Sequence, residues 1–286
     1  MRVAERISEV REAVRSARRE NRTIGLVPTM GALHAGHLSL MEASHRECGY
    51  TVVSIFVNPT QFGPQEDFQR YPRPRDADLA LCEQAGAELV FYPTVEEMYP
   101  PGATTFVEVG GLSEIWEGAI RPGHFRGVAT VVAKLFQIVQ CDRAYFGQKD
   151  YQQQLVLRRM VRDLDFPLEI VTCPIIRDAD GLALSSRNAY LSAAERQAGL
   201  AIPAALNEAE EAIAEGKIEP GKLRELMRQR LERTPGLKLE YALLVDPETM
   251  QELDGPAKTM VALIAARVGG TRLIDNAIFT LDRAWN

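Results

Sequence analysis

Apolar residues in the first half of the chain form short runs that alternate with helical patterns. Five β-rich runs have the length of strands buried in a sheet: residues 23–28, 51–57, 87–93, 142–147 and 168–176. Apolar residues recur at helical spacing in the segments around them: residues 3–14, 33–49, 76–85, 128–139 and 150–163. Strands that alternate with helices in this way predict βαβ units and a parallel sheet.

The pattern changes after about residue 177. An alanine- and glutamate-rich helix is predicted over 193–216 and a second helix over 219–233, before strand-like runs at 237–246, 259–268 and 271–279. We therefore expect an α/β fold, with a Rossmann-like parallel sheet and helices on both faces over residues 1–177. A smaller C-terminal α+β domain is expected over residues 178–286. Earlier in the chain, TTFVEV (104–109) predicts a further strand or one arm of a hairpin.

Composition narrows the classes of protein without selecting one. With 46% hydrophobic and 25% charged residues, the chain has the balance of a globular protein with a substantial core. Its net charge of −6 argues against broad binding to nucleic acid or to a membrane surface. No stretch approaches the length of a membrane span, and the first residues lack the apolar core of a secretion signal. Four cysteines without a CxxC pair predict reduced core thiols and a cytoplasmic location: Cys48, Cys82, Cys141 and Cys173.

The candidate chemistry begins at PTMGALHAGH (28–37), where the first of these runs ends and a helix begins. His34 and His37 are two of the chain's four histidines, and on a helix they share one face, with Gly36 between them. Ligands bind at the carboxyl ends of parallel strands, and a helix start offers N–H groups that suit phosphate. A metal site would need a third strong ligand that the local sequence lacks, and a buried structural histidine is the plainer alternative. The coincidence of glycine, strand end and helix start favours phosphate binding.

The HxGH spacing resembles the HIGH signature of nucleotidyl transferases and class I aminoacyl-tRNA synthetases, whose histidines donate hydrogen bonds to phosphate oxygens. The Walker and GxGxxG phosphate loops are both absent from the sequence. Four further segments narrow the choice: VNPTQFGPQEDFQRYPR (57–73), RPGHFRGV (121–128), FGQKDYQQ (146–153) and DGLALSSRN (180–188). Together with PTMGALHAGH, in matching order over roughly residues 20–195, they resemble the pantothenate synthetase (pantoate–β-alanine ligase) family.

The resemblance implies a reaction in two steps. ATP and (R)-pantoate give pantoyl adenylate and pyrophosphate, and the amine of β-alanine then displaces AMP to give pantothenate. His37 corresponds to the family's proton donor, while His34, Lys149 and Arg187 act on the phosphates. The implied ATP-binding residues are Met30, Gly31, Ala32, Leu33, His34, Ala35, Gly36, His37, Gly147, Gln148, Lys149, Asp150, Ile176, Leu184, Ser185, Ser186 and Arg187. Residues 184–187 resemble the mobile loop that closes over the triphosphate, so the C-terminal domain is expected to act as a lid.

Two glutamines carry the implied pantoate site. Gln61 and Gln153 correspond to the family's pantoate ligands, and Gln61 also faces β-alanine. Neutral amides suit this role, because they orient a carboxylate without holding back its charge as an arginine would. Met30 and Arg121 are further expected substrate contacts. Supporting positions near this pocket are His124, Tyr71 and Arg73.

The resemblance also implies Mg²⁺ with the ATP, and a homodimer. Asp78 is the best candidate metal ligand, but Ala77 stands where some relatives carry the second acid of a pair, so phosphates and water would supply most of the coordination. Two alternatives remain open at this point. A nucleotidylyltransferase of the same superfamily would use HxGH equally well, and a non-catalytic nucleotide sensor would bind ATP without releasing pyrophosphate.

Overall fold

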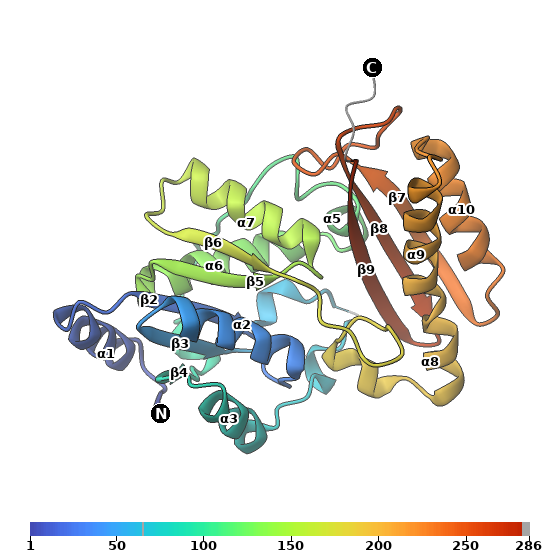
Figure 1. Ribbon diagram of the computed structural model, residues 1–286. Coiled ribbons are helices and arrows are strands. Elements are labelled where there is room, and N and C mark those ends of the chain that lie inside the picture. Colours follow the sequence, from blue (N-terminus) through green and yellow to red (C-terminus); the bar gives the residue numbers. More distant parts are fainter. Residues whose placement is uncertain (65, 282–286) are drawn as a thin grey trace. The chain divides into compact units, whose positions relative to one another are not determined.

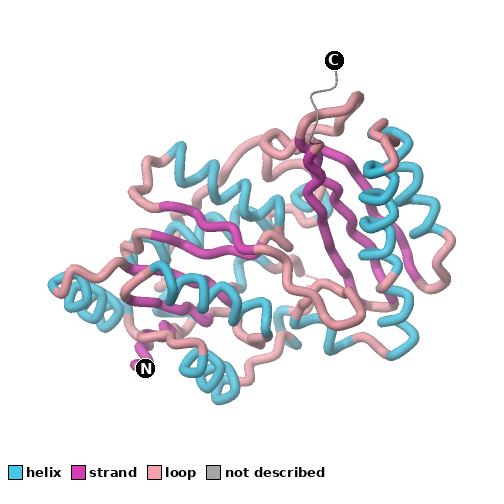
Figure 2. The backbone as a smooth tube through the Cα atoms, viewed as in Figure 1, coloured by secondary structure: helices cyan, strands magenta, loops and turns pink. Residues whose placement is uncertain are grey.

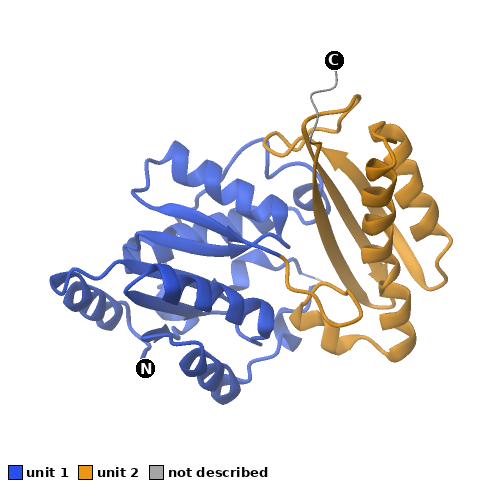
Figure 3. Cartoon of the chain, viewed as in Figure 1, with its two compact units in different colours: residues 1–174 blue, residues 175–286 orange. Residues whose placement is uncertain are grey.

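The computed structural model describes residues 1–64 and 66–281. The chain divides into two compact units, Met1–Pro174 and a second unit that begins at Ile175 (Figure 3). The division falls three residues before the expected boundary after residue 177. Each unit has its own sheet, as Figure 2 shows, and each is described by itself. None of the helices in the described part of the chain is long and apolar enough to cross a membrane.

The first unit is built on a parallel sheet of six strands (Figure 1). The strands are β1 (Arg2–Ala4), β2 (Ile24–Thr29), β3 (Tyr50–Ile55), β4 (Leu89–Phe91), β5 (Arg143–Gly147) and β6 (Glu169–Cys173). Their order across the sheet is β1-β4-β3-β2-β5-β6. The chain moves from β2 to β3 in one direction and later adds β5 on the other side of β2. This reversal between β2 and β5 is the switch point at which open α/β sheets bind their ligands.

Helices cover both faces of this sheet, as predicted. They are α1 (Ile7–Arg19), α2 (Ala35–Glu47), α3 (Arg75–Gln84), α6 (His124–Val139) and α7 (Tyr151–Asp163), with two one-turn helices, α4 (Val95–Met98) and α5 (Glu117–Ile120). On one face α2 packs against α3, and on the other α6 packs between α1 and α7. The right-handed rule for βαβ units explains this division, because the crossovers run in opposite directions from β2.

The helix predicted over residues 128–139 is confirmed as α6, and the apolar residues that gave its period are the buried ones. The apolar stripe of α6 is buried throughout: Val128, Val131, Val132, Leu135, Phe136 and Val139. Full burial of such a side chain contributes about 1.5–3 kcal/mol, so this helix is a major source of stability for the first unit. The apolar runs of the central strands are equally buried, with Ile24, Leu26 and Val27 fully inaccessible.

One predicted strand in the first unit is wrong, and one predicted helix begins later than expected. Residues 104–109 form no strand, because the backbone N–H of Val107 donates instead to the Thr130 hydroxyl of α6 at 3.0 Å. The amphipathic helix expected from Val3 is present as α1, but it begins only at Ile7, and the short edge strand β1 precedes it. Three residues are too few to show a period, and β1 exists through its pairing with β4, 87 positions away, where Arg2 lies opposite Leu89.

The second unit is the expected smaller α+β fold. Its sheet is antiparallel in the order β7 (Leu237–Val245), β8 (Thr259–Val268) and β9 (Thr271–Thr280). Its helices are α8 (Ala193–Gly199), α9 (Ala201–Ala214) and α10 (Pro220–Glu232). The helix predicted over 193–216 is divided at Leu200. Pro203 explains the break, since it has no N–H to donate to Gly199 and its ring would meet that carbonyl.

Candidate active site

Three of the segments predicted to bind ATP and pantoate follow the carboxyl ends of neighbouring strands in the first unit. Residues 30–37 follow β2, residues 148–150 follow β5, and residues 58–61 follow β3. Because β3, β2 and β5 are adjacent and parallel, their carboxyl ends lie at one edge of the sheet. The topology thus brings these three segments to the switch point described above.

The loop after β2 has a shape that its sequence makes possible. Gly31 has φ +82° and Ala32 has φ +50°, so two successive residues adopt left-handed backbone conformations. The loop is held by bonds to side chains: Gly31 N–H donates to the Thr29 hydroxyl at 3.2 Å. Ala32 and Leu33 N–H donate to the two carboxylate oxygens of Asp78 at 2.9 and 2.8 Å. The loop therefore enters α2 in a fixed direction.

The two histidines occupy the start of α2. His34 is the N-cap, and its Nδ1 accepts the Gly36 N–H at 3.2 Å. The His34 N–H in turn donates to Nδ1 of His37 at 3.3 Å, and the two rings lie 4.1 Å apart between centroids. Since both Nδ1 atoms accept hydrogen bonds, the neutral rings carry their hydrogen on Nε2, where it is a donor. The helix start adds N–H groups and a partial positive charge.

Lys149 lies close enough to His37 to affect the pKa of its ring. Burial lowers the pKa of His37 to about 3, and electrostatic interactions with His34 and Lys149 lower that pKa further. His37 is therefore neutral at physiological pH in this structure. Lys149 follows β5 directly, and the N–H of Gln148 donates to the Cys173 carbonyl at 2.8 Å, which ties this turn to β6. The strand ends of β2 and β5 thus present two imidazoles and an ammonium group.

Gln61 lies beside the same loop. Its amide Nε2 contacts the sulfur of Met30 at 3.2 Å, so two expected substrate contacts are neighbours. Its Oε1 accepts from Nδ2 of Asn58 at 3.1 Å, and Asn58 is only 1% exposed. Asn58 also donates to the Gly127 carbonyl of α6 at 3.2 Å. A Cβ on Gly127 would lie 2.3 Å from the Thr60 carbonyl oxygen, so only glycine lets α6 approach this closely.

The three successive glutamines at the start of α7 have different environments. Gln152 is buried, with its amide donating to the carbonyls of Leu112 and Ile115 at 2.7 and 2.8 Å. Gln154 is also buried, and its Oε1 accepts from Arg158 Nε at 2.7 Å. Gln153 is partly exposed, and its amide makes no hydrogen bond with residues 1–64 or 66–281. Of the three, Gln153 alone keeps its side chain available for a ligand.

Arg121 is surrounded by protein partners. Its guanidinium forms a bidentate pair with Glu66 at 2.7 and 2.8 Å and lies 3.6 Å from Glu117. It also donates to His124 Nε2 at 3.1 Å, and His124 Nδ1 donates to the Gln61 carbonyl at 2.9 Å. Burial lowers the pKa of His124 to about 4, with a smaller effect from the Arg121 charge. This cluster therefore fixes the segment that carries Gln61.

The remaining supporting positions also hold that segment. Tyr71 is buried, and its carbonyl accepts from Arg73 at 3.0 Å. Arg73 donates as well to the Phe68 carbonyl at 3.0 Å and lies over the Phe68 ring. Arg73 therefore stabilises the turn between the segment that carries Gln61 and α3.

Asp78 is a poor fit to a metal site. It is 1% exposed, and both of its carboxylate oxygens are engaged by loop N–H groups. Within the described residues, no group of three or more His, Cys, Asp or Glu side chains is placed to hold a metal ion. A buried carboxylate that accepts two backbone N–H groups has a structural role that the sequence alone did not indicate.

The other expected nucleotide residues belong to the second unit. Leu184 N–H donates to the Ile176 carbonyl at 2.9 Å, so these two predicted positions are joined directly. Ser185 caps the 3-10 helix η3 (Ser186–Tyr190), its hydroxyl accepting the Arg187 N–H at 3.3 Å. Arg177 anchors the base of this loop to Asp275 of β9 through bonds of 2.6 and 3.1 Å.

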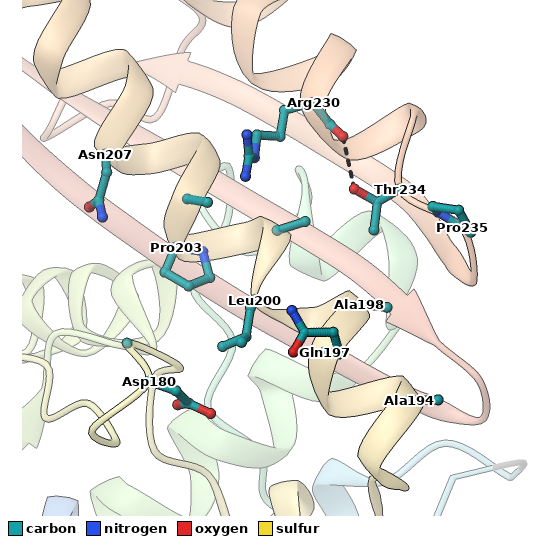
Figure 4. A pocket seen from close by; sticks show the side chains of 13 residues that line it. Asp180, Ala194, Gln197, Ala198, Leu200, Pro203, Asn207, Arg230, Thr234 and Pro235 are labelled. Atoms are coloured by element: carbon teal, nitrogen blue, oxygen red, sulfur yellow. Dashed lines mark hydrogen bonds between the residues drawn. The ribbon is translucent and has the colours of Figure 1, made fainter.

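A separate pocket also lies in the second unit, lined by side chains of α8, α9 and α10 (Figure 4). Asp180 and Pro203 line it, together with Arg230 and Thr234, whose hydroxyl donates to the Arg230 carbonyl at 2.9 Å. None of the predicted site residues lines this pocket, and we assign it no role in the chemistry.

Known proteins match this chain along nearly its whole length. Residues 2–278 match the family described as Pantoate-beta-alanine ligase. A pantothenate synthetase from Acidobacterium capsulatum is 56% identical over 97% of each chain, and one from Moorella thermoacetica is 51% identical over 99% of this chain and all of the other.

Solved structures agree in fold. The crystal structure of pantothenate synthetase from Thermus thermophilus is 48% identical and has a TM-score of 0.93, covering 97% of this chain and 99% of that one. A pantoate-beta-alanine ligase from Francisella tularensis, complexed with beta-gamma ATP and beta-alanine, is 33% identical with a TM-score of 0.80 over 97% of each chain. The resemblance seen in the sequence motifs is confirmed, and the chain belongs to the pantoate–β-alanine ligase family.

Proposed function

We propose that this chain condenses (R)-pantoate with β-alanine to pantothenate at the expense of ATP, through a pantoyl-adenylate intermediate. One observation carries the proposal: His34, His37 and Lys149 gather at the switch point, next to the Met30–Gln61 contact. Phosphate-directed donors and an uncharged amide are thus neighbours. Activation of a carboxylate by a triphosphate needs this combination.

In the first step, a carboxylate oxygen of pantoate attacks the α-phosphorus of ATP. The bond from that phosphorus to the oxygen bridging the β-phosphate breaks, and pyrophosphate leaves. Negative charge builds on the phosphate oxygens, where the Nε2–H groups of His34 and His37 donate and the Lys149 ammonium attracts. His37, with its pKa near 3, acts in this account as a neutral hydrogen-bond donor. The N–H groups at the start of α2 add to the same field.

In the second step, the β-alanine amine attacks the acyl carbon, the bond from this carbon to the AMP oxygen breaks, and the nitrogen releases a proton to solvent. We assign pantoate to Gln61 and Gln153, whose neutral amides orient its oxygens without neutralising the nucleophile. The Asn58 contact fixes the amide of Gln61 so that its N–H group faces Met30. Arg121 acts in this account through the Glu66 and His124 contacts that hold the Gln61 segment.

The loop that the family resemblance associates with the triphosphate belongs to the second unit. We assign Arg187, Ser185 and Ser186 to phosphate binding and Leu184 and Ile176 to backbone contacts with the nucleotide. Support comes from the Francisella tularensis relative, which is complexed with beta-gamma ATP and beta-alanine. Mg²⁺ accompanying ATP would neutralise phosphate charge, with phosphate oxygens and water as its main ligands. A homodimer and a cytoplasmic location remain predictions, which sedimentation analysis and cell fractionation test.

Isotope exchange between pyrophosphate and ATP tests the proposal. Exchange should require pantoate and should proceed without β-alanine, while AMP should accumulate only after β-alanine is added. Exchange without pantoate, or none with it, contradicts an adenylate intermediate. A dinucleotide or a nucleotide–alcohol product would indicate the nucleotidylyltransferase alternative, and ATP binding without pyrophosphate release would indicate a sensor.

A further inference from the structure

Four successive backbone N–H groups in the loop after β2 are satisfied by side chains. Gly31 donates to Thr29, Ala32 and Leu33 donate to Asp78, and His34 donates to His37. The Thr29 hydroxyl itself donates a hydrogen bond to the Ser54 carbonyl at 2.8 Å. The backbone of the loop is thus held by side chains of the first unit.

Asp78 carries the centre of this arrangement. It lies in the first turn of α3 and reaches a loop 45 and 46 positions earlier in the chain, with one oxygen for each N–H group. A buried carboxylate is costly unless hydrogen bonds compensate its charge, and charge-assisted bonds of 2.8 and 2.9 Å do so here. The same bonds satisfy two backbone donors in a loop that has no secondary structure of its own.

The loop is fitted closely around this carboxylate. A Cβ on Gly31 would lie 2.8 Å from Asp78 Oδ2 and 3.1 Å from Ile55 Cγ2, so a side chain at position 31 would displace the carboxylate. Gly31 and Ala32 both have positive φ, and the Asp78 bonds lie at and just after these two residues. Strained backbone persists where its surroundings over-determine it, and Asp78 supplies that constraint.

We propose that Asp78 is a positioning residue: its buried carboxylate fixes loop 30–34 so that His34 and His37 face ATP, and it is not a ligand of the magnesium ion. The proposal rests on the proposed function for the identity of the ligand. It departs from the metal assignment suggested by sequence, because both oxygens are already engaged and no cluster of three potential ligands surrounds them in the described part of the chain.

Asp78→Asn tests the proposal with almost no change in volume. An asparagine keeps one accepting oxygen and turns an NH₂ group toward the other backbone N–H, so one bond is lost and two donors face each other. Hydrogen exchange of the Ala32 and Leu33 amides should then be about tenfold faster or more, whether or not the chain turns over substrate. Asp76→Asn is the matched control, because Asp76 is exposed in the same turn of α3. Unchanged exchange at both amides overturns the proposal.

Kinetics separate positioning from metal binding. With Asp78→Asn, KM for ATP should rise about tenfold or more, while the half-activating Mg²⁺ concentration stays within about twofold of the unaltered chain. The opposite result would make Asp78 a metal ligand. In that case the half-activating Mg²⁺ concentration would shift strongly, while KM for MgATP, measured at saturating Mg²⁺, would change little. If the asparagine variant does not fold, Gly31→Ala presses on the same carboxylate from the loop side and should give the same kinetic signature. Failure of the chain to make pantothenate, with faster amide exchange retained, would refute the function and leave the role of Asp78 in the loop intact.

Discussion

Replacing His37 with asparagine separates the two nitrogens of its ring. The asparagine oxygen takes the place of Nδ1, which accepts the His34 N–H, but nothing takes the place of Nε2. The loop bond, with a net value of about 1 kcal/mol, should therefore survive. Losing a donor aimed at transition-state charge costs about 3–4 kcal/mol, which lowers kcat by about 10²–10³.

The assay is AMP release at saturating ATP, pantoate and β-alanine, together with urea unfolding of each variant. His37→Gln, whose amide nitrogen approaches the position of Nε2, should retain more activity than His37→Asn. His45→Ala is the matched control, since His45 is an exposed histidine near the end of the same helix. If His37→Asn keeps kcat within about threefold of the unaltered chain, the role given to this imidazole is wrong.

Three further results follow from the same geometry. Gly127→Ala should destabilise the first unit by about 1–3 kcal/mol in urea unfolding and raise KM for pantoate, because the new Cβ meets the Thr60 carbonyl that precedes Gln61. His124 has a pKa near 4 when folded and near 6.5 when unfolded, so its contribution to stability is complete above pH 6.5 and declines as the pH falls toward 4. Between pH 7.5 and 5 the free energy of unfolding should therefore fall by about 2 kcal/mol more in the unaltered chain than in His124→Asn. An equal fall in both would contradict the lowered pKa of His124. The Cε1 proton resonance of ligand-free His37 should not titrate between pH 8 and 5, because its pKa lies near 3, and a midpoint near 6.5 would contradict the neutral ring.

The architecture could be predicted because its signals are local. Buried parallel strands give continuous apolar runs, and the stripe from Val128 to Val139 gives an unbroken helical period. The predictions failed where a distant partner decides the structure. Strand β1 exists through its pairing with β4, and Val107 is held by a threonine of α6. The division of the predicted helix at Leu200 did have a local signal, the proline at position 203.

The candidate site shows the same limit. The motifs placed His34, His37 and Gln61 at strand ends, and in the structure the two imidazoles lie together while Gln61 contacts Met30 of the same loop. What the sequence reading missed are contacts between remote segments that hold these groups. Asn58 stands in the same motif as Gln61, and the signal available was an amide side chain directly after the largely apolar run 51–57. No local pattern joins Asp78 to its loop, since a bond across 46 positions depends on the sheet order.

Labelled oxygen shows whether the pantoate carboxylate bonds to the α-phosphorus of ATP. Pantoate enriched with ¹⁸O in its carboxylate is converted with unlabelled ATP and β-alanine, and the masses of the products are measured by mass spectrometry. We propose that the carboxylate attacks the α-phosphorus while the imidazoles of loop 30–37 and Lys149 stabilise the charge on the phosphate. This attack predicts AMP that carries one ¹⁸O atom. Unlabelled AMP, or ¹⁸O in inorganic phosphate released with ADP, would show that the carboxylate never bonds to the α-phosphorus and would contradict the account.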